Sequence, residues 1–268
     1  MNSALAEFFV LVAVNNVLLI VLASVGGSTV LGVLGGLLVR RIPHRFNDAV
    51  LGFAAGVMLA AAVLGLLSPA FSMPGGGSFT LALGGVFAGA LLISLLDRIV
   101  PHLHRLAGLD GEEHRNNRSI GRTLLFVSAI ALHKIPEGLA TGVSFGTGDA
   151  GDILTVAGAI SIQNVPEAVV VVAPLFSIGM GARRVLVLAV SIAAISMASV
   201  LCGAVLVSFF SSVQPFLLAA AGGAMLYVIS DEMIPETHSH GYEKAATFAL
   251  IAGFLVVLAL QRFTEGIA

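Results

Sequence analysis

The sequence predicts an all-α polytopic membrane protein that consists of a single domain, residues 1–268. Hydrophobic residues make up 57% of the chain, charged residues make up 10%, and the mean hydropathy is +1.03. This composition is too apolar for a soluble enzyme of the same length. Apolar runs of about 20 residues, the length that crosses a bilayer, recur between short polar connections. We therefore expect the lipid bilayer, and no nucleic acid, as the partner of this chain.

Eight such runs follow one another along the chain. They lie at residues 8–39, 48–69, 79–97, 120–146, 152–177, 183–211, 215–231 and 245–264. The first run is long and contains Gly26-Gly27, where a break would divide it into two helices and invert every later connection. The one sizeable polar connection, residues 101–122, is predicted to be a loop.

The basic residues predict the orientation of these spans. With eight spans and both termini outside, eleven basic residues fall in the inner connections: Arg40, Arg41, Arg45, Arg98, Arg105, Arg115, Arg118, Arg122, Arg183, Arg184 and Lys244. Only Arg262 lies outside, and Lys134 falls within the fourth span. Such a bias is typical of cytoplasmic connections, and a ninth span would scatter it. The sequence therefore predicts extracytoplasmic termini and a cytoplasmic loop at 101–122.

Two polar segments lie near the middle of the fourth and fifth spans. Residues 133–137 read His-Lys-Ile-Pro-Glu and residues 163–167 read Gln-Asn-Val-Pro-Glu, so one pattern recurs after thirty residues. Because consecutive spans run in opposite directions, the two segments are predicted to meet antiparallel at mid-depth, as inverted repeats do in transporters. Each proline frees a backbone carbonyl that must face a cavity or protein rather than lipid. Charged groups at this depth are costly and indicate a functional site.

The side chains of these segments suit a divalent metal ion. His133 and Glu137 are four residues apart and share a helix face, as do Gln163 and Glu167. Imidazole and carboxylate groups bind Zn²⁺ at about 2.0–2.2 Å, and two carboxylates balance its charge. Cys202 is the only cysteine, so a Cys-rich metal site is excluded. The alternative is that these polar residues only bond one another between packed helices.

Three further segments accompany the His-x-x-Pro-Glu-Gly pattern at residues 133–138. They are residues 52–61, residues 96–104 and residues 227–238. In these motifs the chain resembles, over nearly its whole length, bacterial members of the ZIP (Zrt/Irt-like protein) family of metal transporters.

The resemblance implies a fold and a function. The fold has eight helices in a 3+2+3 inverted-repeat arrangement, in which spans one to three are related to spans six to eight, and both termini are extracytoplasmic. The function is transport of a divalent metal ion, most often zinc and alternatively cadmium, iron or manganese, into the cytoplasm. The protein is then a multi-pass protein of the bacterial inner membrane, not an enzyme, and has no organic cofactor. The oligomeric state is not implied, so a homodimer and a monomer are both possible.

The resemblance also implies a set of metal ligands. They are Met58, His133, Glu137, Gln163, Asn164 and Glu167. Met58 has the least physical support, because a methionine in an apolar helix more often serves packing.

Three departures from the family pattern indicate a single transport metal. Relatives often have Asn and Asp where this chain has Lys134 and Asn164, and many have an acidic residue in span six. Here no acidic residue occurs between Glu167 and Asp231. Relatives with the full acidic set can hold two adjacent metals. We therefore expect the Lys134 ammonium to substitute for the second ion.

Several residues near the inner helix ends are candidates for a metal exit route. They are Asp97, Glu232, His102, His104, Asp231, Glu236 and His238. Asp97 and Glu232 are the strongest candidates because they lie within the family-like motifs. The other interpretation of each is a solvated loop or a helix-capping group.

Two other functions are alternatives to metal transport. An intramembrane metalloprotease is expected to carry a His-Glu-x-x-His pair, whereas His133 is the only histidine within a predicted span. A proton-coupled carrier of small solutes is the second alternative, with Glu137 and Glu167 as proton relays.

Overall fold

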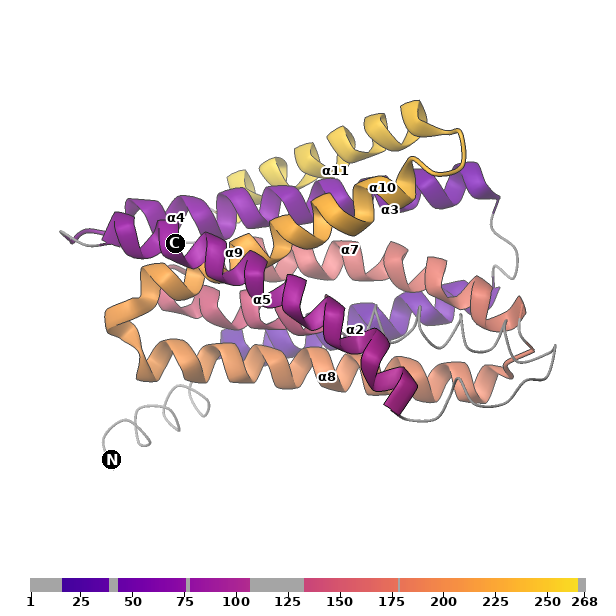
Figure 1. Ribbon diagram of the computed structural model, residues 1–268, viewed down its shortest axis with the longest axis horizontal. Coiled ribbons are helices and arrows are strands. Elements are labelled where there is room, and N and C mark those ends of the chain that lie inside the picture. The colour runs from indigo at the N-terminus through magenta and orange to yellow at the C-terminus, as the bar shows by residue number, and fades with distance from the viewer. Residues whose placement is uncertain (1–15, 39–42, 76–77, 107–132, 178, 265–268) are drawn as a thin grey trace.

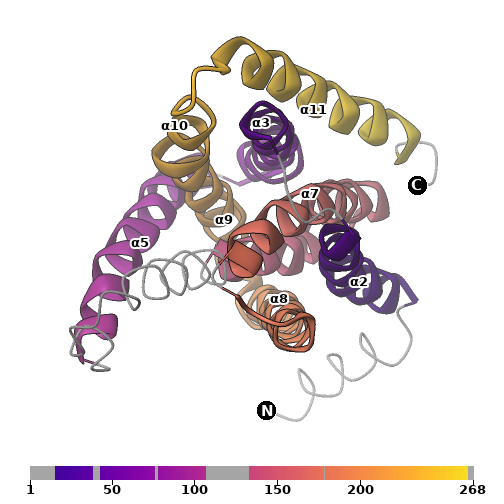
Figure 2. The same ribbon diagram turned by 90° about the vertical axis from the view of Figure 1, so that its right-hand side faces the viewer.

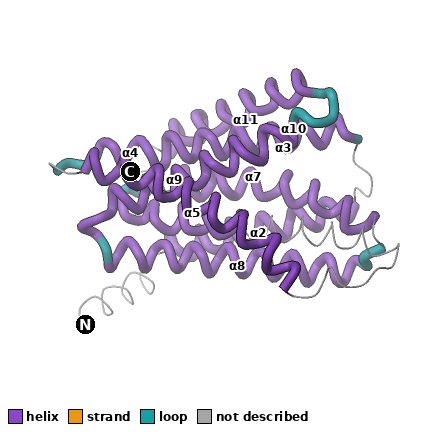
Figure 3. Tube along the Cα trace, viewed as in Figure 1, coloured by secondary structure: helices purple, strands orange, loops and turns teal. Residues whose placement is uncertain are grey.

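The computed structural model describes residues 16–38, 43–75, 78–106, 133–177 and 179–264. Every regular element within these ranges is a helix. The long helices run side by side along the longest axis of the molecule (Figures 1 and 3). Seven of the described helices are long and apolar enough to cross a membrane. The predicted class, an all-α polytopic membrane protein, is therefore confirmed.

The helices follow the predicted runs closely. Their bounds are α2 Asn16–Leu38, α3 His44–Ala60, η1 Ala61–Leu67, α4 Ser68–Ser72, α5 Ser78–Leu106, η2 Ser144–Thr147, α7 Ala150–Ser177, α8 Ala182–Phe209, η3 Ser211–Val213, α9 Gln214–Val228, η4 Ile229–Met233, α10 Ile234–Thr237 and α11 Glu243–Thr264. The fourth span is described from His133 onward, and its residues 133–143 are α-helical.

Two boundaries differ from the sequence-based expectation. α2 is one unbroken helix across Gly26-Gly27, so the described part of the first run does not contain two helices. α5 continues to Leu106, so residues 101–106 of the predicted loop are helical. An apolar run marks the thickness of the bilayer, whereas a helix can continue beyond it into water. Residues 8–15 and 107–122 lie outside the described part of the chain.

The contacts between helices have the exchange symmetry of an inverted repeat. α3 packs on α11 and α5 packs on α9, so the second span pairs with the eighth and the third with the seventh. α2 packs on α7, and residues 133–143 pack on α8 through Gly138 and Gly142. Exchanging spans one to three with spans six to eight, and span four with span five, converts the α3–α11 pair into the α5–α9 pair. It likewise converts the α2–α7 pair into the pair formed by residues 133–143 and α8. Figure 2 shows α7 in the middle of the bundle, with α5 and α11 at its periphery.

Glycines allow the peripheral helices to pack at close range. A Cβ added at Gly56 would lie 1.9 Å from the Leu250 carbonyl oxygen, and one at Gly89 would lie 1.8 Å from that of Ala220. The partner helices contribute Gly253 and Gly223 in the same way. Small residues have this function in membranes because lipid provides no hydrophobic drive between helices.

Two π-helical segments interrupt the second and seventh spans. η1 follows α3 directly, and η4 connects α9 to α10. π-helical turns are rare, and they occur frequently at functional sites. Met58 lies three residues before η1, and Asp231 and Glu232 lie within η4. Both segments therefore fall beside residues that the sequence marked as metal ligands.

Candidate metal centre

The Lys134 ammonium lies at the centre of a buried polar cluster between the fourth and fifth spans. Its Nζ donates to Glu137 Oε2 at 2.7 Å, to Asn164 Oδ1 at 2.8 Å and to Glu167 Oε2 at 2.5 Å. Lys134 is only 3% exposed, and the other three residues are also buried. An ammonium has three donors, so these three acceptors satisfy it completely. With both carboxylates ionised, the side chains of Lys134, Glu137 and Glu167 together carry one net negative charge.

The two sequence motifs create this cluster together. Lys134 and Glu137 are three residues apart on the fourth span, so they lie on one helix face. Asn164 and Glu167 have the same spacing on α7. The bonds from Lys134 to both α7 residues show that the two segments meet, as predicted. They meet through Lys134 and Asn164 rather than through the expected His133 and Gln163.

α2 holds the Asn164 side chain in one orientation. Asn164 Nδ2 donates to the Val25 carbonyl oxygen and to Ser28 Oγ, each at 3.2 Å, while its Oδ1 accepts from Lys134. Ser28 Oγ in turn donates to the Val25 carbonyl oxygen at 3.0 Å. The amide oxygen therefore faces the cluster and the amide nitrogen faces α2. The role of Ser28 is not predictable from the sequence, because a lone serine in an apolar helix gives no signal.

His133 belongs to a second group of potential metal ligands. Its Nε2 lies 2.8 Å from Glu232 Oε1 of η4, and Asp97 of α5 is the third member. One ligand atom from each residue lies within 4.8 Å of the other two. Asp97 Oδ2 is buried and has no hydrogen-bond partner among the described residues. Two carboxylates and an imidazole are a ligand set that suits Zn²⁺.

The remaining predicted ligands are buried but make no contact with either group through a described hydrogen bond or ion pair. Gln163 is fully buried, and neither its Oε1 nor its Nε2 has a partner in the described chain. Met58 is 2% exposed and packs in the hydrophobic core. The structure thus joins Glu137, Asn164 and Glu167 around Lys134, and it places His133 with Asp97 and Glu232 instead.

The other exit-route candidates are more exposed. Asp231 and Glu236 are exposed, and His238 Nδ1 contacts the Ile234 carbonyl oxygen and Thr237 Oγ1. The side chains of His102 and His104 lie outside the described residues. None of these described side chains belongs to the Asp97–His133–Glu232 group.

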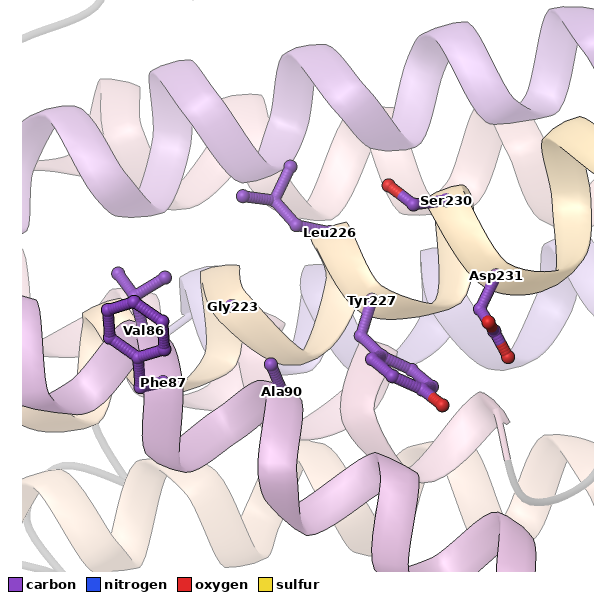
Figure 4. A pocket seen from close by; sticks show the side chains of 8 residues that line it. All are labelled: Val86, Phe87, Ala90, Gly223, Leu226, Tyr227, Ser230 and Asp231. Atoms are coloured by element: carbon purple, nitrogen blue, oxygen red, sulfur yellow. The ribbon is translucent and has the colours of Figure 1, made fainter.

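A groove of about 390 Å³ between α5 and α9 reaches Asp231 (Figure 4). Its lining residues are Val86, Phe87, Ala90, Gly223, Leu226, Tyr227, Ser230 and Asp231. One carboxylate at the end of an apolar groove does not form a metal site, so the two buried groups remain the candidates.

The fold and these two groups define a multi-pass membrane protein that buries, between its helices, side chains of the types that can ligate a metal ion. A family model described as "ZIP Zinc transporter" matches residues 107–261, more than half of the chain, and the chain belongs to the ZIP family.

Three similar proteins support this assignment. Zinc transporter ZIPB of Bordetella bronchiseptica is 39% identical over 240 residues, which cover 87% of this chain and 77% of the relative. Zinc transporter GufA of Myxococcus xanthus is 36% identical, with 88% and 94% covered. Zinc transporter ZupT of Corynebacterium glutamicum is 34% identical, with 84% and 91% covered. Members of the family are transporters rather than enzymes, which excludes the metalloprotease alternative.

Proposed function

We propose that the protein transports divalent transition-metal ions, zinc foremost, across the membrane into the cytoplasm. The observation that carries this proposal is a pair of buried carboxylates, Glu137 and Glu167, that already hold a cation, the Lys134 ammonium. Buried charges in a membrane are retained where function requires them. The relatives named as zinc transporters support zinc as the first substrate to test.

The central cluster has enough oxygen atoms outside the Lys134 contacts to bind one metal ion. Lys134 contacts only the Oε2 atom of Glu137 and of Glu167, which leaves the Oε1 atom of each carboxylate outside the ammonium contact. Gln163, whose amide oxygen has no partner among the described residues, adds a third oxygen on the same helix as Glu167. These groups, with His133, Asn164 and Met58, are the proposed ligands. Lys134 takes the place of a second ion.

His133 connects the central cluster with the Asp97–His133–Glu232 group. It adjoins Lys134 in sequence, bonds to Glu232, and interacts electrostatically with Glu137 and Glu167. We place the Asp97–His133–Glu232 group on the exit route of the metal, in agreement with the sequence-based choice of Asp97 and Glu232. An imidazole that faces both groups in turn is suited to transfer the ion between them.

The proposed direction and location follow from the charges of the connections. The basic residues of the segment 101–122 favour a cytoplasmic position, with both termini outside and the protein in a bacterial inner membrane. The same oxygen and nitrogen ligands accept Cd²⁺, Fe²⁺ and Mn²⁺, so these ions are further substrate candidates.

Metal uptake into proteoliposomes tests this function. Purified wild-type protein should give saturable uptake of Zn²⁺ that a trapped fluorescent indicator reports. Glu137→Ala should abolish it, because the substitution removes a proposed ligand and a partner of Lys134. The matched control is Glu243→Ala, which removes an exposed carboxylate from the first turn of α11 and should transport normally. Wild-type uptake by a folded Glu137→Ala variant would show that the metal does not use this cluster.

A further inference from the structure

A group of two histidines and an aspartate lies apart from both metal-ligand groups. His44 and Asp48 are four residues apart in the first turns of α3, and His240 comes from the connection between α10 and α11. His240 Nδ1 lies 3.0 Å from Asp48 Oδ1. The rings of His44 and His240 stack, with centroids 4.7 Å apart and planes inclined by 26°. The group joins segments almost 200 residues apart in the sequence.

Asp48 is the buried base of this group. Its side chain is 0% exposed, and its Oδ2 has no hydrogen-bond partner within the described chain. Burial of a carboxylate is costly unless it is paired. Within the described ranges its one side-chain partner is His240, whose side chain is 30% exposed. A buried acid thus supports an imidazole at the surface.

The contacts of Nδ1, to Asp48 Oδ1 and to Ser239 Oγ at 3.0 Å each, determine which nitrogen of His240 is available. When Nδ1 carries the proton and donates it to the carboxylate, Nε2 holds a lone pair. To the residues that the structure describes, Nε2 makes one long contact, 3.5 Å to Ser239 Oγ. A carboxylate behind an imidazole, with the second ring nitrogen unprotonated, is the arrangement found around metal-ligating histidines. His44 supplies a second imidazole directly beside it.

We infer that His44 and His240 form an accessory binding site for a divalent transition-metal ion, with Asp48 orienting His240 from behind. Imidazole pairs suit ions such as Zn²⁺, Cu²⁺ and Ni²⁺. His44 is exposed, so its ring can turn from the stacked position to direct a nitrogen at the ion, while water completes the coordination. The site is distinct from the Asp97–His133–Glu232 group, and binding to it does not depend on transport.

Histidine substitution isolates the site from every other imidazole. The chain has seven histidines, and replacing His102, His104, His114 and His133 with alanine leaves three. These are His44, His240 and His238, the last of which lies in the same connection but contacts Ile234 and Thr237 rather than Asp48. His238→Ala is therefore the matched control.

Zn²⁺ titration calorimetry on this purified background, with the affinity tag removed, measures the site directly. We expect one micromolar-range event, weakened at least tenfold by His44→Gln or His240→Gln and unchanged by His238→Ala. Asp48→Asn should weaken binding by about 10- to 100-fold, as loss of a supporting carboxylate does elsewhere. The inference would be overturned if both His→Gln variants bound Zn²⁺ as tightly as the variant with the four histidines replaced. It would also be overturned if His238→Ala weakened Zn²⁺ binding as much as they do.

A measurement on the wild-type protein avoids any dependence on how the variants fold. Diethyl pyrocarbonate modifies accessible imidazoles, and mass spectrometry reports the extent at each histidine. Zn²⁺ should protect His44 and His240 at least fivefold more than His238. Equal modification of His44 and His240 with and without Zn²⁺ would show that the contact of His240 with Asp48 only fastens the α10–α11 connection to α3.

Discussion

At the scale of single residues, the defining feature is a lysine whose three hydrogen bonds all end on the proposed metal ligands. Lys134 binds Glu137, Asn164 and Glu167, and no described side chain other than these three bonds to its ammonium. Removing one partner of a buried ion pair leaves an uncompensated charge, which costs more than the pair itself contributes. Lys134 is therefore expected to stabilise the metal-free protein by keeping the two carboxylates together.

The variant Lys134→Met tests this role. It retains the length of the side chain but leaves two buried carboxylates without their cation, so metal-free stability should fall by about 3–5 kcal/mol. Zn²⁺ should raise the Tm of this variant more than that of the wild type, because the ion then supplies the missing charge. Thermal unfolding in detergent measures both effects.

Lys244→Met is the control for this experiment, because Lys244 is the only other lysine and is exposed on α11. It should melt like the wild type. If metal-free Lys134→Met also melts like the wild type, the ammonium does not balance the carboxylates.

The sequence predicted which segments meet but not every partner within them. Adjacent helical residues point about 100° apart, which lets His133 and Lys134 take different partners in this structure. Lys134 turns to Glu137 and α7, and His133 turns to Glu232. The spacing of His133 and Glu137 suggested a shared ligand face, yet the choice of partner depends on where η4 lies, which is a property of the fold.

At the scale of helices, close packing through glycine characterises the α5–α9 and α3–α11 pairs, among others. The backbone of one helix occupies the space that a side chain would need on the other. The apolar runs predicted the helices themselves, since a bilayer span has a fixed length. They did not predict that α5 continues to Leu106 or that η1 and η4 are π-helical, because neither feature changes the hydropathy.

Two glycines of α5 provide a matched test of this packing. Gly89→Ala places a Cβ 1.8 Å from the Ala220 carbonyl oxygen, so α5 and α9 must separate. We expect a loss of about 1–3 kcal/mol, typical of overpacking. Gly84→Ala meets nothing within 4 Å and should be neutral or slightly stabilising. The Tm of the two variants in detergent compares them, and equal values would contradict the proposed role of the close contact.

At the scale of the whole molecule, the helix pairs are arranged as expected for two inverted halves around the fourth and fifth spans. The pairs α3–α11 and α5–α9 are equivalents of each other, as are α2–α7 and the pair formed by 133–143 and α8. Such an arrangement places the two polar motifs at the centre, where the structure finds them. The orientation of this bundle in the membrane remains a prediction from the basic residues.

Cysteine labelling tests that orientation. In a Cys202→Ser background, which removes the only native cysteine, a Gly111→Cys variant should resist an impermeant thiol reagent on intact cells. It should react once the cells are permeabilised. A cysteine at Ser3, which the same topology places outside, should react at once and serves as the control. Rapid labelling of the cysteine at position 111 from outside would reverse the proposed entry and exit ends.

The number of ions at the central cluster tests the account most directly. Crystals of the wild-type protein soaked in Cd²⁺ should show one anomalous peak beside Glu137 and Glu167, with the Lys134 ammonium still in place. The double variant Lys134→Asn with Asn164→Asp removes the cation and adds a carboxylate, so it should come closest to admitting a second ion. Two central peaks in the wild type, or none, would contradict the proposal that Lys134 substitutes for a second metal in a single-metal transport site.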